Sequence, residues 1–295
     1  MASLRMRAVR AVLRLTRKRG MATVERARKR IAAPKASYAP PAALRKRHDV
    51  RSREVEGFPC TTVAPRDGRS TRAAIYLHGG AYISEISPQH WTLISALADA
   101  GVRVEVPSYG LAPQHTYREA YPFLGSVYRR LLADVDASAI TFVGDSAGGG
   151  LALGFAQTLA GVGLPQPGRL VLISPWLDLT LSNPDLDAIR DPWLNRVGLA
   201  EAAAAWAGGD DPTDPRLSPL NGPLSGLAPM DVYVGTRELC LPDVLLLKDR
   251  CATEGVTPQV TVCEGAVHVY PLVPAPEGRA AARTIVRSVS QDSVS

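Results

Sequence analysis

The sequence predicts an α/β protein with a mostly parallel central sheet and helices on both faces of that sheet. From about residue 57 onward, short apolar runs alternate with longer amphipathic stretches, the pattern of strands and helices in turn. The composition agrees, because 46% hydrophobic and 21% charged residues in a chain of 295 are typical of folded globular proteins. These values exclude disordered, collagen-like and coiled-coil chains, and no apolar run approaches the roughly 18 residues of a membrane span.

Six apolar runs are the expected strands, and five helical stretches lie between or after them. The expected strands are Ala73–Leu77, Val102–Val106, Ala139–Val143, Leu170–Ile173, Asp231–Val234 and Gln259–Val262. The expected helices are Trp91–Ala100, Tyr117–Leu132, Ala147–Leu159, Pro242–Ala252 and Gly278–Val289. The stretch 176–224 breaks this rhythm. It is rich in Pro and Asp and holds an Ala-rich helix near Leu199–Ala207, so we expect an insertion over one edge of the sheet.

Charge separates a basic N-terminal segment, residues 1–47, from the main domain, residues 48–295. The segment carries 15 Lys and Arg against one acid, Glu25, whereas the rest of the chain holds 19 Lys and Arg and 27 Asp and Glu. The pI of about 9.3 therefore describes the front end rather than the body. A nucleic-acid partner is not expected, because no aromatic residues interleave with the early basic ones.

The N-terminal segment is predicted to hold two helices before a linker. A first helix is expected within 1–19 and a second from Thr23 to Ile31, and the prolines at 40 and 41 then interrupt helical structure. In the first helix, apolar residues recur at helical spacing: Leu4, Ala8, Ala11, Val12 and Leu15. Two interpretations stay open, a solvated basic helix pair packed over the body and peripheral contact with anionic lipid through residues 1–47.

Cysteine and histidine spacing predicts neither a disulfide framework nor a metal site. The four cysteines show no CxxC or zinc-finger spacing, and no histidine pair has HExxH spacing: Cys60, Cys240, Cys251 and Cys263. The longest apolar run in the first 30 residues is three residues, so no secretory signal peptide is expected. We therefore expect reduced thiols and a cytoplasmic protein, with association at a membrane surface as the alternative. The oligomeric state stays open, a homodimer included.

The nucleophile is expected at Ser146. It lies in Gly144-Asp145-Ser146-Ala147-Gly148, directly between an expected strand and an expected helix. A serine in such a turn needs very small neighbours, because the turn is strained and brings backbone close to the adjacent strands. This is the GxSxG nucleophile elbow, which lifts the hydroxyl above the sheet. A phosphate-binding loop is disfavoured, since no GK[ST] follows.

Backbone amides near two glycines are the expected oxyanion donors. The strand Ala73–Leu77 ends in His78-Gly79-Gly80-Ala81-Tyr82, and glycines let backbone N–H groups point into a cleft without obstruction. With the amide of Ala147, the amides of Gly79 and Gly80 would complete an oxyanion hole. His78 is expected to shape this loop rather than to act as a base.

His268 is the expected base and Glu238 the expected acid. His268 is the one histidine after Ser146, and the α/β-hydrolase order places the base last. Glu238 follows the strand Asp231–Val234. Asp243 is the alternative, although it is better placed to begin the next helix. The acids of the insertion are expected to be surface or turn residues: Asp178, Asp185, Asp187 and Asp191.

Several motifs together resemble the hormone-sensitive-lipase family of α/β-hydrolases, in its bacterial carboxylesterase and lipase form. These are HGGAY at 78–82, YGLAPQH at 109–115, GDSAGG at 144–149 and HVY at 268–270, in the family's order. The resemblance implies ester hydrolysis through Ser146, Glu238 and His268, with Gly79, Gly80 and Ala147 as the oxyanion hole. It also implies no cofactor and an N-terminal helical cap over the acyl pocket.

The chain departs from the family pattern at two motifs. Ala81 stands where the oxyanion motif commonly has a third Gly, and Gly110 and Gln114 replace an Arg and a Glu. The second change removes a cation and an anion together, as if an ion pair had been lost.

The expected substrate is a small uncharged carboxylic ester of short to medium acyl chain. The expected pocket walls are largely apolar, which favours such an ester. Lactones, amides and longer-chain lipids stay open, because the same triad serves them. A non-catalytic ligand-binding receptor of the same fold is the alternative from another class.

Overall fold

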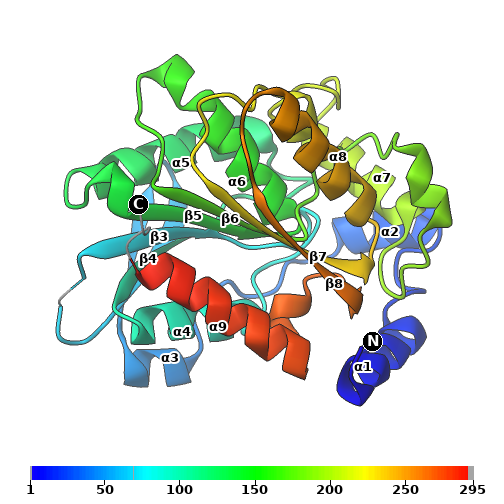
Figure 1. Ribbon diagram of the computed structural model, residues 1–295, viewed down its shortest axis with the longest axis horizontal. Helices are drawn as coiled ribbons and strands as arrows, with labels where there is room; N and C mark the ends of the chain where they lie inside the picture. The colour runs from blue at the N-terminus through cyan, green and yellow to red at the C-terminus, as the bar shows by residue number, and fades with distance from the viewer. Residues whose placement is uncertain (1, 69, 292–295) are drawn as a thin grey trace.

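A computed structural model describes residues 2–68 and 70–291 of the chain (Figure 1). In this part of the chain, eight strands form one sheet in the order β1-β2-β4-β3-β5-β6-β7-β8. The strands are β1 Asp49–Val55, β2 Phe58–Ala64, β3 Arg72–Leu77, β4 Val102–Pro107, β5 Ile140–Asp145, β6 Arg169–Ile173, β7 Met230–Arg237 and β8 Gln259–Val267. β2 pairs antiparallel with both β1 and β4, and the other neighbouring strands pair parallel.

Helices cover both faces of the sheet. The helices are α1 Leu4–Thr16, α2 Val24–Ala32, α3 Ala42–Arg47, α4 Pro88–Asp99, α5 Tyr117–Leu132, α6 Ala147–Thr158, α7 Arg196–Ala207, α8 Leu241–Thr253 and α9 Pro276–Ser290. α5, α6 and α8 lie on one face, and α4 and α9 lie on the other (Figure 1). The predicted α/β sheet covered on both faces is therefore confirmed.

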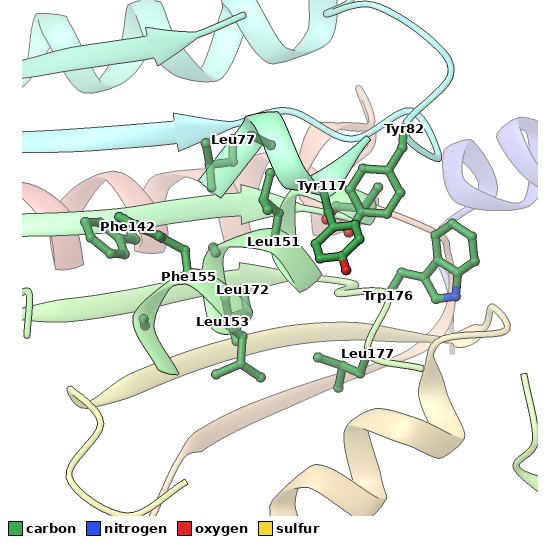
Figure 2. Packing of buried hydrophobic residues seen from close by; sticks show 14 of the residues in the cluster. Leu77, Tyr82, Tyr117, Phe142, Leu151, Leu153, Phe155, Leu172, Trp176 and Leu177 are labelled. Carbon is green, nitrogen blue, oxygen red and sulfur yellow. The ribbon is translucent and has the colours of Figure 1, made fainter. Parts of the chain in front are cut away.

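The core consists of two clusters, one on each face. Alternate residues of β3 point to opposite sides, so Ala73, Ile75 and Leu77 join one cluster and Ala74 and Tyr76 join the other. On the first face, side chains of α6 pack against the central strands (Figure 2). Strands that are buried on both faces read as nearly continuous apolar runs, which is why the sequence reveals them.

All six expected strands and all five expected main-domain helices are present, and the Ala-rich helix of the stretch 176–224 is α7. The hairpin β1–β2 and the short helix α3 were not predicted. Much of β1 is exposed at the sheet edge, so it lacks the apolar run of a buried strand. Gly57 was the available sequence signal, because the structure gives Glu56 and Gly57 φ values of 49° and 79°, the two positive φ angles of a type I′ turn, which favours glycine.

The two expected N-terminal helices are present. The first does not pack against the protein through the apolar stripe that the sequence analysis identified. Met6 is buried in the second core cluster, and Val9 and Leu13 pack against that cluster. Leu4 and Leu15 face solvent. α2 packs against α7 through Ala27 and Ile31. None of the helices in the described part of the chain is long and apolar enough to cross a bilayer.

Candidate active site

Ser146 lies in a sharp turn between β5 and α6. Its backbone has φ 53° and ψ −122°, and its amide donates to the Ile173 carbonyl at 2.8 Å. The flanking glycines permit this turn. A Cβ on Gly144 would lie 2.3 Å from the Gly148 carbonyl oxygen, and a Cβ on Gly148 would lie 2.0 Å from that of Leu77. Only glycine fits at both positions, as the elbow motif requires.

His268 comes directly after β8, three strands along the sheet from β5, and reaches Ser146 at the shared carboxyl edge of these parallel strands. Its Nε2 lies 2.8 Å from the Ser146 Oγ. The ring is buried, and the edge of Trp193 packs against it with ring centroids 5.7 Å apart. Two residues 122 positions apart in the sequence are thus within hydrogen-bond distance.

Glu238 follows β7 and holds the other ring nitrogen of His268. Its Oε2 lies 2.6 Å from the His268 Nδ1. Its Oε1 accepts from the Ser174 hydroxyl at 2.8 Å and from the Gly235 amide at 2.5 Å. The same Ser174 hydroxyl accepts from the Val269 amide at 3.0 Å, which ties the acid loop to the histidine loop. The carboxylate is fully buried and is held by three donors.

Electrostatics in this chain favour proton uptake by His268. Burial alone would lower the pKa of His268, but the hydrogen bond to Glu238 and its charge outweigh burial, so the pKa is raised above its ordinary 6.5. Burial raises the pKa of the Glu238 carboxyl, and contact with His268 offsets part of that rise. Because Nδ1 donates to Glu238, Nε2 is left to accept the proton of the Ser146 hydroxyl.

Asp243, the alternative acid, lies outside this chain of hydrogen bonds. Its Oδ1 accepts from the Asn183 side chain at 2.9 Å, and it sits in the first turn of α8. Burial raises the pKa of the Asp243 carboxyl to about 6. Of the two candidate acids, Glu238 is therefore the one that bonds to His268, whereas Asp243 links α8 to the insertion through Asn183.

The expected oxyanion loop lies against the nucleophile. A Cβ on Gly79 would lie 2.9 Å from the Ser146 Cβ, and Gly80 has a φ of 128°. The Gly80 carbonyl accepts from the Ile83 and Ser84 amides, which fold the loop into a tight turn. Ala147 is the first residue of α6, where helix amides have no intrahelical partner. The Gly79 amide, however, donates to the Asp145 carboxylate, so the structure corrects its expected role as an oxyanion donor. The amides of Gly80 and Ala147 remain as the candidate donors.

Comparison with known proteins gives the family. Residues 74–272 match a family model described as the alpha/beta hydrolase fold. An acetyl-hydrolase of Streptomyces hygroscopicus is 33% identical over 75% of this chain and 77% of its own length. A triacylglycerol lipase of Mycobacterium tuberculosis is 32% identical over 68% of this chain but only 42% of its own length. The chain belongs to the α/β-hydrolase family.

Solved structures place this α/β-hydrolase on the hormone-sensitive-lipase branch. An esterase from the bacterial hormone-sensitive lipase family is 29% identical, covers 99% of both chains and has a TM-score of 0.82. An esterase/lipase from an uncultured bacterium is 28% identical over 98% of both chains, with a TM-score of 0.83. The resemblance read from the sequence motifs is thereby confirmed.

A second histidine pairs with an acid beside Ser146, the expected nucleophile, and the sequence did not reveal this pair. The Asp145 carboxylate accepts from His90 Nε2 at 3.1 Å and from the Tyr76 hydroxyl at 3.0 Å. Burial alone would raise the pKa of Asp145, but contacts with His90, Tyr76 and the Gly79 amide lower it. His90 in turn accepts at Nδ1 from the Ser87 amide at 2.8 Å. This network fixes the oxyanion loop against the elbow.

Asp191 and Asp178 are buried, which corrects the expectation of surface positions. Asp191 accepts from the amides of Trp193, Leu194 and Leu239, so it anchors the insertion to the loop that carries Glu238. Asp178 does close a turn, as predicted, because it accepts from the Thr180 and Ser182 amides. Of the four acids that the sequence analysis considered, Asp185 and Asp187 are exposed. The buried pair could not be told from the exposed pair by local sequence, since all four lie among turn residues.

Among the residues that the structure describes, one group of side chains could offer ligand atoms to a metal ion, and it overlaps the candidate triad Ser146, His268 and Glu238. Ligand atoms of Glu238, Cys240 and His268 lie within 4.8 Å of one another. Burial raises the pKa of the Cys240 thiol well above its ordinary value, so the thiol stays protonated and is a poor ligand. The carboxylate and the ring nitrogen already bond to each other. The group is best understood as an acid–base pair with a neighbouring thiol.

His115 fills the space beside Gly110, where the family pattern has an arginine. A Cβ on Gly110 would lie 2.4 Å from the ring of His115. That ring packs edge-on against Phe58 with centroids 5.0 Å apart. An aromatic contact thus occupies the place of the ion pair that the sequence comparison suggested was lost.

Proposed function

We propose that the protein is a serine carboxylesterase that hydrolyses uncharged short- to medium-chain carboxylic esters. The observation that carries the proposal is the continuous hydrogen-bond chain from the Ser146 hydroxyl through His268 to Glu238, with Ser146 on a strained elbow. The names of relatives and structural neighbours, acetyl-hydrolase and esterase among them, support it. The chain spans less than two thirds of some relatives, so those names alone would not decide it.

The proposed reaction is acyl transfer in two steps. His268 takes the proton of Ser146 as its Oγ attacks the ester carbonyl, and Glu238 stabilises the imidazolium that forms. The amides of Gly80 and Ala147 hold the oxyanion, while the Gly79 amide stays bonded to the Asp145 carboxylate. The alcohol leaves with the proton from His268, and water then repeats the sequence on the acyl-enzyme to free the acid.

Large aromatic rings beside the elbow support a short acyl chain. Tyr82 stacks on Trp206 with centroids 4.3 Å apart and on Trp176 at 5.9 Å (Figure 2 shows Tyr82 and Trp176). The middle ring and one outer ring of this stack are fastened to the elbow, because the Tyr82 hydroxyl donates to the Ala147 carbonyl and the Trp176 amide donates to the Ser146 carbonyl. Rings held in this way leave little room to extend an acyl chain past them.

The N-terminal segment 1–47 is proposed to act as the cap over the substrate. Its α2 packs on α7, and Met21 lies against Gly198 of that helix. The Lys18 carbonyl accepts from the Asn195 side chain at 2.5 Å, and the Lys18 ammonium donates to the Leu194 carbonyl. These contacts hold the segment beside Trp193, the residue packed on the base.

The test is turnover of p-nitrophenyl esters from acetate to palmitate, by wild type beside Ser146→Ala. We expect activity that is greatest on short chains and that falls by about 10⁴-fold or more in the variant. Substantial activity in folded Ser146→Ala would mean another nucleophile. Folded wild type without activity on any chain would favour a lactone or amide substrate, or a non-catalytic receptor.

A further inference from the structure

Helix α1 carries two apolar faces, and only one of them packs against the protein. The inner face is formed by Met6, which has no exposed surface, with Val9 and Leu13 beside it. These residues pack into the cluster that contains Val267 and Tyr270, the neighbours of the catalytic histidine. Residues at positions 6, 9 and 13 share one side of a helix, so this face accounts for the docking of α1.

The outer face of α1 is apolar as well, and it is open to solvent. Leu4 is 80% exposed, Val12 57% and Leu15 79%. With Ala8 and Ala11 between them, they follow helical spacing and form one stripe on the side opposite Met6. Each of the three is among the exposed large hydrophobic residues of the molecule. A stripe of this length along one helix is a patch rather than scattered single residues.

Arginines border this outer stripe, and acids do not. At 100° per residue, Arg7 and Arg14 fall along one side of the stripe and Arg5 falls along the other. α1 contains no acidic residue. Within residues 2–68 and 70–291, none of these three arginines forms an ion pair with another side chain. The charges are therefore available to a partner outside the chain.

We propose that the outer face of α1 docks on the surface of an anionic lipid bilayer. An apolar stripe flanked by arginines is the composition of a helix that lies in the plane of the interface, with its apolar side among acyl chains and its cations at anionic headgroups. A second copy of the chain fits less well, because a symmetric contact through this face would bring like charges together. Nucleic acid would leave the leucines without a role.

The position of α1 gives this docking a consequence for the active site. α1 packs beside β8 and lies at the edge of the molecule near the ends of β7 and β8 (Figure 1). Gly265 lies three residues before His268, and a Cβ on Gly265 would lie 2.7 Å from the Ala2 Cβ. A membrane bound to α1 would thus lie next to the histidine loop, and esters partitioned into the bilayer would be presented to it.

Vesicle co-sedimentation of the full chain tests this inference. The vesicles are phosphatidylcholine alone or phosphatidylcholine with about a third phosphatidylglycerol. We expect binding to the anionic vesicles, little binding to the neutral ones, and loss of binding in about 1 M salt, where the Debye length is about 3 Å. The inference goes beyond the proposed esterase activity, and Ser146→Ala should bind as wild type does.

Two pairs of variants distinguish a specific effect of the outer face of α1 from a general effect of lost charge or lost hydrophobicity. Arg7→Gln with Arg14→Gln should lower vesicle partitioning on the order of tenfold or more. The control Arg129→Gln with Arg130→Gln removes the same charge from the exposed end of α5 and should change it little. Leu4→Ser with Leu15→Ser should also lower partitioning, unlike Leu245→Ser with Leu246→Ser on α8.

Three results would overturn the inference. They are no binding of folded wild type to anionic vesicles, equal binding to neutral vesicles, and equal loss in the test and control variants. Light scattering on the same samples tests whether a second copy of the chain, rather than a bilayer, covers the outer face of α1. A dimer that Leu4→Ser with Leu15→Ser converts to a monomer, in a protein that ignores vesicles, would assign the face to a second copy.

Discussion

The proposed chemistry of this member of the α/β-hydrolase family depends on where single side chains place their polar atoms. Ser146, His268 and Glu238 are spread over 122 residues of sequence, yet each follows a strand of the parallel sheet, and parallel strands bring their carboxyl ends to one edge. Ser146 was predictable from the GxSxG motif, and His268 from its place as the one histidine after Ser146 in the sequence. The link from His90 to Asp145 was not predictable, because His90 has no local motif and meets Asp145 only through packing.

At this scale, Glu238→Gln should harm catalysis much more than Asp243→Asn. The amide of Gln can donate to Nδ1 and hold His268 in the wrong tautomer, which typically costs about 10³–10⁴-fold in kcat. Asp243 contacts Asn183 instead, so its loss should cost mainly stability. Steady-state kinetics on a p-nitrophenyl ester and thermal unfolding of both variants provide the check. The reverse order in kcat would move the acid to Asp243.

The pH profile reports the same pair. A base must be neutral to act, and the pKa of His268 is raised by Glu238. The rate should therefore fall as pH drops through a value above 6.5, the ordinary pKa of the ring. In Glu238→Gln, the acid limb of the remaining activity should move to lower pH than in the wild type, because the charge that raises the pKa of His268 is gone. A limb that stays in place would separate Glu238 from the titration of His268.

At the scale of elements, the apolar pattern of the sequence revealed the strands that are buried on both faces of the sheet. The central strands and their helices were predicted for that reason. The edge strand β1 was missed because exposed strands carry polar residues, and its more buried partner β2 was missed because Pro, Cys and Thr interrupt its apolar run. Helix α1 was predicted, but its packing face was not, since apolar residues lie on both sides of it and only tertiary contacts select Met6 over Leu4.

The contact of the N-terminal segment with α7 offers a test of the proposed cap. A Cβ on Gly198 would lie 2.5 Å from the Met21 Cβ, so Gly198→Val should push the segment away from α7. We expect KM for a p-nitrophenyl ester to rise several-fold with a smaller change in kcat. Gly161→Val, which has open space around its Cβ position, is the control and should leave KM unchanged. An unaltered KM in folded Gly198→Val would argue against a cap.

At the scale of the whole molecule, a mildly acidic domain holds the chemistry and a basic segment covers one end of it. The two parts are joined at the active-site edge, through Met6 near the histidine loop and Lys18 near Trp193. Composition alone showed the division of charge. It could not show that the segment borders the candidate site, because that depends on contacts between residues nearly 180 positions apart.

The central claim, that Ser146 is a nucleophile activated by His268, is tested most directly by covalent labelling. A fluorophosphonate is attacked at phosphorus by an activated serine oxygen, fluoride leaves, and the adduct is stable enough for mass spectrometry. We expect one adduct per chain, mapped to the peptide that contains Ser146. It should be absent in Ser146→Ala and much slower to form in His268→Ala. A folded wild-type protein that stays unlabelled, or that is labelled at another residue, would contradict the account.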